Sequence, residues 1–182
     1  MRILSVDCST NSFAYGVSED GKIESYGEVY FVGTEVHKRC QDARRKVESI
    51  LDQFKDIDYI VFEDVVKVVN IRSTISMAKV YGTVISVLLD LGAKLVMVEP
   101  LVWQSAIGVK SPAGQVRKDL IAGHPELKTK NQINKFIREY RKQKIMDFVE
   151  DKYGIKAPND NVGDALAINS FAFERIAEIL QR

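Results

Sequence analysis

The sequence has few cysteines and no long apolar run. Cys8 and Cys40 are its two cysteines, too few for a disulfide framework in a chain of 182 residues. No apolar stretch approaches the roughly 18 residues that span a bilayer, and the opening MRILSVD lacks the apolar core and cleavage site of a signal peptide. These absences argue against a disulfide-stapled secreted domain and a membrane-spanning protein, so we expect a cytoplasmic protein with no membrane partner.

Paired histidines, repeats and linkers are also lacking. His37 and His124 lie far apart in the sequence and give no metal-ligand spacing. We find no internal repeat, low-complexity tract or interdomain linker. With 46% hydrophobic and 28% charged residues, the composition is that of an ordinary globular protein. The chain is therefore expected to form one domain over residues 1–182, large enough to bury a core.

The net charge of +1 conceals a strongly basic segment. Between residues 110 and 144, ten basic residues face three acidic ones, a local balance of +7, so the rest of the chain must carry about −6. Such an asymmetry favours a polyanionic partner. A solvated helix with many ion pairs would explain the same charges equally well.

Apolar patterning predicts the elements of the fold. Short apolar or alternating runs predict strands at residues 2–7, 12–19, 21–31, 58–64 and 93–100. Apolar residues at helical spacing predict helices at residues 35–54, 73–91, 102–107, 131–153 and 161–180. This order indicates an α/β fold with a central mixed five-stranded sheet, in which the first three strands form an antiparallel meander. The fourth and fifth strands are expected to run parallel to the first, with helices on both faces.

Acidic residues end two of the most apolar strands. Asp7 follows RILSV, and Glu63 lies in YIVFED. The topology predicts that these strands are neighbours whose carboxyl ends meet, where open α/β sheets place their chemistry. Asp164, in NDNVGDALAI, falls on the apolar side of the last helix. Three converging carboxylates repel one another unless a proton or a cation joins them, which favours a site for Mg²⁺ or Mn²⁺.

Each of these acids also has an ordinary structural explanation. Asp7 can be a turn residue, Glu63 an ion-pair partner and Asp164 a capping residue. Asp160 is likewise placed to cap the last helix. The metal interpretation therefore depends on convergence. Two ions about 4 Å apart can activate water and stabilise the leaving oxygen in phosphodiester hydrolysis.

The acidic segments resemble a known family. Asp7 in RILSVD, Glu63 in YIVFED and Asp164 in GDALAI together resemble the RuvC group of Holliday junction resolvases, in the RNase H-like superfamily. The segment VEPLVWQSAIG is similar to the phage-type branch. The resemblance, which covers most of the chain, implies a homodimer that uses Mg²⁺ or Mn²⁺, two ions per site, to nick symmetric strands of four-way and other branched DNA junctions. It also implies the cytoplasm of a bacterial cell and fits a phage-encoded protein.

The chain departs from the family at two points. The family commonly has Asp or His three residues before the helix Asp, and Asn161 occupies this position here. Asp160, about one helical turn before Asp164, is favoured as the compensating ligand over a site of three carboxylates. An inactivating substitution at Asn161 stays open as an explanation. The turn after the first Asp reads Cys-Ser-Thr, whereas bacterial members usually have Pro-Gly-Ser.

The resemblance implies a set of site residues. Lys142 matches the lysine that the family places near the scissile phosphate, with Lys144 next, although both lysines can simply face solvent. The expected metal ligands, which with Lys142 make up the catalytic set, are Asp7, Glu63, Asp160 and Asp164.

The basic segment is expected to contact DNA. It looks longer than in bacterial family members, and we interpret residues 110–140 as a basic helical insertion that mostly contacts phosphates. Arg72 follows the fourth strand, where the family keeps a junction-contacting loop. The predicted DNA-binding residues are Arg72, Lys110, Arg117, Lys118, Lys128, Lys130, Arg141, Lys142 and Lys144.

Two other functions are weighed against the nuclease. A catalytically inactive RNase H-like module that binds nucleic acid or protein is favoured by Asn161 alone. An actin- or hexokinase-type phosphate-binding domain would also begin with a strand-end Asp and a Ser/Thr-rich turn. That fold needs two such domains and glycine-rich phosphate loops, for which 182 residues are too few.

Overall fold

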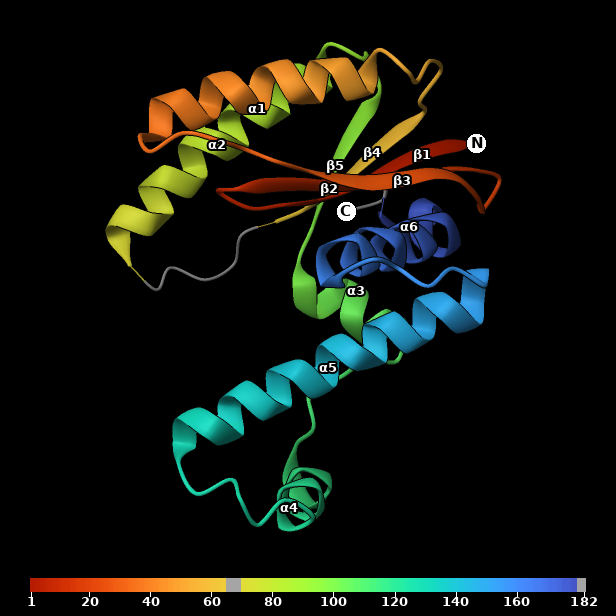
Figure 1. The fold of residues 1–182 in the computed structure, drawn as a ribbon. Coiled ribbons are helices and arrows are strands. Elements are labelled where there is room, and N and C mark those ends of the chain that lie inside the picture. Colours follow the sequence, from red (N-terminus) through yellow and green to blue (C-terminus); the bar gives the residue numbers. More distant parts are fainter. Residues whose placement is uncertain (65–69, 180–182) are drawn as a thin grey trace.

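The computed structural model describes residues 1–64 and 70–179, which form a sheet with helices on both faces (Figure 1). The strands are β1 (Arg2–Cys8), β2 (Ser12–Glu19), β3 (Lys22–Tyr30), β4 (Tyr59–Glu63) and β5 (Lys94–Val98). They lie in the order β3-β2-β1-β4-β5. β1 to β3 are antiparallel, β4 is parallel to β1, and β5 is parallel to β4. The predicted mixed sheet is therefore confirmed.

The helices of the described part of the chain are α1 (Val36–Leu51), α2 (Ile71–Leu89), α3 (Pro100–Ala106), α4 (Gly114–Ala122), α5 (Lys130–Tyr153) and α6 (Asp160–Ile179). α1 and α2 cover one face of the sheet, and α6 covers the other, with α3 and α5 beyond it (Figure 1). Helices on both faces were expected from the alternation of strands and helices. No described helix is long and apolar enough to cross a membrane.

The alternation of side chains along β1 decides which way its aspartate points. Leu4 and Val6 pack under α1 and α2, whereas Ile3 packs with α6 on the opposite face. Successive strand residues face opposite sides of a sheet. Asp7 therefore faces α6, and its neighbour Cys8 is buried under the other helix layer.

Two polar contacts and one glycine hold α6 close to the sheet. The buried side-chain amide of Asn169 donates hydrogen bonds to the carbonyl oxygens of Ile3 and Gly16, each at 3.3 Å. At Gly16, an added Cβ would lie 3.0 Å from Cδ2 of Leu166. A residue with a side chain would push the helix away. The first turns of α6 lie near the end of β1 and the start of β2, since Asp164 is affected by the charge of Asp7 and Asn161 lies 3.5 Å from Ser12.

Asn159 caps α6. Its side-chain oxygen accepts a hydrogen bond from the backbone N–H of Val162 at 3.0 Å, whereas Asp160 is the first residue inside the helix. The expectation that Asp160 caps this helix was therefore wrong, because the helix begins one residue earlier than the apolar pattern suggests. The side chain of Asp160 is left available for another partner.

α4 and the first half of α5 lie farthest from the sheet (Figure 1). The sequence pattern does not predict α4, because none of its residues is buried and its apolar periodicity is weak. Thr129 and Gln132 form a capping box that starts α5. Arg117 on α4 donates a hydrogen bond to Asn134 on α5 at 3.3 Å, which joins the two helices. We call residues 110–140 the basic arm.

Candidate active site

Asp7 and Glu63 lie side by side at the ends of two adjacent strands. The parallel register pairs Val6 with Phe62, so the next residues on the two strands are Asp7 and Glu63. Both are half-buried, and their carboxyl groups hydrogen-bond to each other. The predicted neighbourhood of these two acids is present in the structure.

Asp164 joins them from α6. Its charge and that of Asp7 each raise the pKa of Glu63, and Asp7 also raises the pKa of Asp164. One carboxylate oxygen, Oδ1 of Asp164, is buried and has no hydrogen-bond partner among the described residues. A buried carboxylate oxygen without a partner is costly and indicates that a proton or cation belongs there.

The three acids hold protons more tightly than ordinary carboxyl groups. Burial is the main cause, and it raises the pKa of Asp7 to about 6, of Asp164 to about 7 and of Glu63 to about 9. For Asp164 and Glu63, the negative charges of the neighbouring acids add to the effect of burial. The buried indole of Trp103 lies beside Glu63 and partly offsets the rise in its pKa. Clustered carboxyls with raised pKa values are typical of functional sites.

The donor chemistry of the cluster fits a hard cation, whereas the side chains are not yet arranged around one. Among residues 1–64 and 70–179, no group of three or more His, Cys, Asp or Glu side chains could hold a metal ion as it stands. Asp7 and Glu63 bond to each other instead. An ion would take the place of the proton that this pair shares and would partner the free oxygen of Asp164.

Two basic residues of α5 adjoin the acids. Lys142 and Arg141 lower the pKa of Asp164 against the stronger effects of burial and Asp7, and Lys142 also lowers that of Asp7. Lys142 forms an ion pair with Asp160. The structure thus places Lys142 and Asp160 together at the margin of the acidic cluster, and ligation of metal by Asp160 stays a prediction.

Glu28, on β3, is a site residue that the sequence interpretation missed. The register pairs Asp7 with Ala14 and Ala14 with Glu28, so both acids face α6 from one row across the sheet. Glu28 accepts hydrogen bonds from the side-chain amides of Asn161 at 2.6 Å and Asn159 at 2.8 Å. Although burial raises the pKa of Glu28, hydrogen bonds led by that of Asn161 outweigh it, and the pKa is lowered.

The predicted DNA-binding residues fall into three places. Arg72 is exposed at the start of α2. Arg141 and Lys142 are half-buried near the acids, and Lys144 lies 5.7 Å from the centre of the Tyr140 ring. The basic arm carries Lys110, Arg117, Lys118, Lys128 and Lys130, of which Arg117 alone is half-buried.

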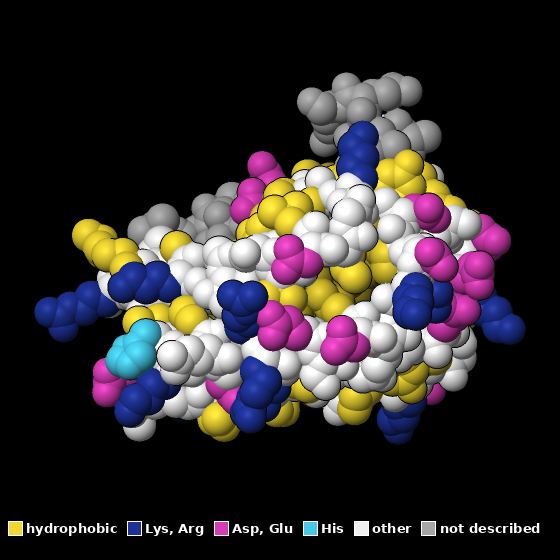
Figure 2. Space-filling model, turned by 90° about the horizontal axis from the view of Figure 1, so that it is seen from above, with side chains coloured by type: hydrophobic (Ala, Val, Ile, Leu, Met, Phe, Trp, Pro, Cys, Tyr) yellow, Lys and Arg dark blue, Asp and Glu magenta, His cyan; other side chains and the backbone are white. Residues whose placement is uncertain are grey.

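The face of the molecule that α1 and α2 cover carries both basic and acidic side chains. Viewed from the side of α1 and α2, Lys and Arg side chains are interspersed with Asp and Glu (Figure 2). On this face, Arg44 pairs with Glu48 and Lys46 pairs with Asp42. By the residue count, the excess of positive charge lies between residues 110 and 144, in α4, α5 and the segments around them.

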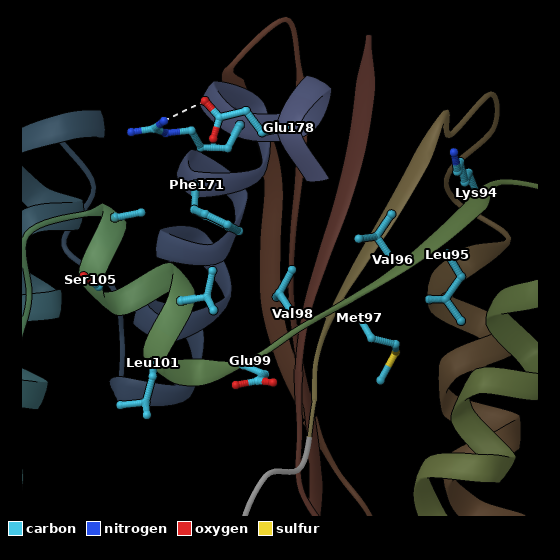
Figure 3. Close-up of a pocket in the computed structure, with 13 residues that line it drawn as sticks. Lys94, Leu95, Val96, Met97, Val98, Glu99, Leu101, Ser105, Phe171 and Glu178 are labelled. Atoms are coloured by element: carbon cyan, nitrogen blue, oxygen red, sulfur yellow. Dashed lines mark hydrogen bonds and ion pairs between the residues drawn. The ribbon is translucent and has the colours of Figure 1, made fainter. Parts of the chain in front are cut away.

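A hollow of about 810 Å³ lies along β5, between that strand, α3 and α6 (Figure 3). Its lining is largely aliphatic, and Phe171 and the ion-paired Arg175 and Glu178 close it from α6. Asp7, Glu63 and Asp164 are not among its lining residues. The hollow is therefore separate from the acidic cluster.

Comparisons with known proteins identify the fold. No protein-family model and no curated protein matches the sequence. Among solved structures, Thermus thermophilus RuvC in complex with a Holliday junction substrate is similar at 14% identity, with a TM-score of 0.69 over 97% of this chain and 96% of that one. Another T. thermophilus RuvC structure matches at 16% identity and a TM-score of 0.67, over 98% of both chains.

The yeast mitochondrial Holliday junction resolvase Ydc2 is 15% identical, with a TM-score of 0.55 over 99% of this chain and 82% of that one. Matches along nearly the whole chain argue against the actin- or hexokinase-type alternative. They do not bear on the similarity to the phage-type branch, which stays a prediction. The chain has the RNase H-like fold of the RuvC resolvases.

Proposed function

We propose that the protein is a metal-dependent, structure-selective endonuclease that resolves four-way and other branched DNA junctions. The observation that carries this proposal is the cluster of Asp7, Glu63 and Asp164 at the strand ends of a RuvC-type fold, with one buried carboxylate oxygen unpartnered. Proteins with this fold include a RuvC whose structure is known in complex with a Holliday junction substrate. Acids held this close are suited to binding cations rather than to packing.

Mg²⁺ or Mn²⁺, two ions per site, would be held by Asp7, Glu63 and Asp164, with Asp160 as a further ligand once Lys142 releases it. When bound, such ions lower the pKa of water and stabilise negative charge on a phosphodiester. The three acids must lose their protons to bind them. Lys142 then places its ammonium group near the phosphate and stabilises developing charge.

The basic arm supplies phosphate contacts to the DNA on either side of the site. Phosphate contacts fix the position of the duplex and carry no sequence information directly. Two symmetric cuts in a four-way junction require two sites, so we propose a homodimer with one site per subunit. We also propose that the protein acts on DNA in the cytoplasm of a bacterial cell and that a phage encodes it.

A cleavage assay with three substrates tests the function. The protein is incubated with a synthetic four-way junction, a flap and a linear duplex of the same sequence, each with Mn²⁺ or with EDTA. We expect Mn²⁺-dependent cuts at symmetric positions of the junction, and little cleavage of the duplex. Binding to the junction without any cleavage would instead support the inactive module that Asn161 favours.

Loss of charge on the basic arm is expected to weaken DNA binding without changing the position of the cuts. Lys118 is exposed on α4 and Lys130 is exposed at the start of α5, and these segments lie farthest from the sheet (Figure 1). In the double variant Lys118→Gln/Lys130→Gln, the slope of log affinity against log salt should become less steep by about 2, one for each lost phosphate contact. Fluorescence anisotropy at several salt concentrations measures this slope.

The matched control removes two exposed lysines from the rest of the molecule, Lys38 and Lys55. This control should keep the wild-type slope. Equal slopes for the two double variants would contradict the assignment of the basic arm.

A further inference from the structure

Glu28 accepts hydrogen bonds from two side chains at the start of α6. Both oxygens of its carboxylate are used: Oε1 accepts from the amide of Asn161 at 2.6 Å, and Oε2 accepts from that of Asn159 at 2.8 Å. These are short, charge-assisted hydrogen bonds, which are stronger than those between neutral groups. A residue of the edge strand β3 thus holds the residue that caps α6 and one residue of its first turn, through bonds that span 131 and 133 residues.

The orientation of Asn159 is fixed by its second bond. Its oxygen caps α6 by accepting the N–H of Val162, so its NH₂ group must point toward Glu28. Asn161 also approaches the hydroxyl of Ser12 at 3.5 Å, and that hydroxyl lies 3.0 Å from the hydroxyl of Ser9. The hydrogen-bond network around Glu28 therefore extends through Ser12 to Ser9, in the turn that follows β1.

The turn of α6 that is hydrogen-bonded to Glu28 immediately precedes Asp164. Asp164 lies three residues after Asn161 on the same helix and therefore on a neighbouring position of its surface. Asp7 lies two strands from Glu28 in the same row of the sheet. A shift of this turn relative to β3 would change the distance between Asp164 and Asp7.

We infer that Glu28 is a positioning residue of the candidate active site, which holds Asp164 opposite Asp7 through Asn159 and Asn161. The inference rests on the proposed function, since the site that Glu28 positions is the proposed metal site. It requires a carboxylate at residue 28 and an amide at residue 161, because the two side chains meet within hydrogen-bond distance. An aspartate in place of Asn161 would set two carboxylates against each other.

An exchange of the carboxylate at residue 28 with the amide at residue 161 would restore the hydrogen bond between these two positions. In the double variant Glu28→Gln/Asn161→Asp, the Gln oxygen accepts from Asn159 and its NH₂ group donates to the new carboxylate. Both hydrogen bonds between residue 28 and residues 159 and 161 are then kept, and the total charge is that of the wild type. In Asn161→Asp alone, this pairing fails and the carboxylates repel.

A double-mutant cycle tests the inference. Mn²⁺ affinity is measured by calorimetry, and the unfolding temperature is measured in EDTA, for the wild type, Glu28→Gln, Asn161→Asp and the double variant. We expect Asn161→Asp to weaken Mn²⁺ binding about tenfold or more, as loss of groups that orient metal ligands does. Glu28→Gln should weaken it less, and the double variant should return to within about threefold of the wild type, the signature of a coupled pair.

The matched control is Glu24→Gln, which removes a carboxylate of the same strand that pairs with Arg2 at 2.8 Å instead of α6. If Asn161→Asp binds Mn²⁺ more tightly than the wild type, or if both single variants bind it as Glu24→Gln does, the inference is overturned while the proposed function stands. A wild-type protein that binds no Mn²⁺ would overturn both. Unfolding temperatures in EDTA separate loss of positioning from loss of fold.

Discussion

Replacement of Asp7 by Asn is expected to reduce junction cleavage by at least about a thousandfold, because ligand loss removes several kcal/mol of transition-state stabilisation. Asp7 interacts with both of the other acids of the cluster: it hydrogen-bonds to Glu63, and its charge adds to the effect of burial in raising the pKa of Asp164. The variant is expected to fold, since an Asn amide can donate to Glu63 in place of the shared proton. Initial rates of cutting with Mn²⁺ measure the effect.

Junction binding by Asp7→Asn should be retained or strengthened, because the variant removes a negative charge that would face phosphate. The matched control is Asp20→Asn, in the turn between β2 and β3, where Asp20 pairs with the amino terminus at 2.7 Å. Its positive φ of 47° is a conformation that Asn accepts readily. Cleavage by Asp7→Asn at the rate of Asp20→Asn would disprove the proposed mechanism.

The metal-free protein is expected to become less stable as pH rises. The folded pKa values of Asp7, Asp164 and Glu63, about 6, 7 and 9, lie above those of an unfolded chain. The folded state therefore binds more protons than the unfolded state between pH 4 and 9, and stability falls with pH over that interval. The free energy of unfolding should therefore decrease by several kcal/mol between pH 5 and pH 9.

Asp164→Asn should flatten this pH dependence and raise the unfolding temperature at pH 8 in EDTA by about 5 °C. It removes one charge from the cluster, and an amide can use the space of the unpartnered oxygen. Added Mg²⁺ or Mn²⁺ should stabilise the wild type more than the variant. Thermal unfolding at five pH values, with EDTA and with metal, measures these effects. Stability that rises from pH 5 to pH 9 would contradict the assignment.

The sheet and the three acids of the cluster were predictable from short-range patterns. Asp7 and Glu63 follow continuous apolar runs, and a buried strand that ends in an acid marks the carboxyl edge of the sheet. Asp164 was placed on the apolar side of its helix from Ala165, Ala167 and Ile168, all of which are buried. Helical periodicity alone therefore placed Asp164 toward the sheet.

The orientation of Glu28 toward α6 was not predictable from the sequence, because β3 contains an irregularity. Ile23 packs on the α6 face, and strict alternation would then turn Glu28, five residues later, to the opposite face. The pairing shifts by one residue between Val17 and Ser18, which leaves Glu24 as an extra residue and brings Ile23 and Glu28 to the same face. A sequence read with a period of two does not show such a bulge.

The ion pair of Lys142 with Asp160 was not predictable either. It depends on how α5 crosses beside α6, and the apolar pattern of α5 fixes its inward face without fixing that crossing. Lys142, with Lys144 next, was predicted to lie near the scissile phosphate because of the resemblance to the RuvC group. The structure adds that one of them, Lys142, also has a carboxylate partner from α6.

The candidate active site is assembled from segments that are distant in the chain. Glu63 and Asp164 are separated by about 100 residues, and α6 lies against β1 and β2, which are synthesised before it. At a translation rate of about 5 to 20 residues per second, a ribosome needs roughly 5 to 20 s to pass from one acid to the other. A nascent chain therefore carries two of its three acids without the third. Under the proposed function, the growing polypeptide could not assemble its metal site, and so could not cut DNA, until α6 had emerged and docked.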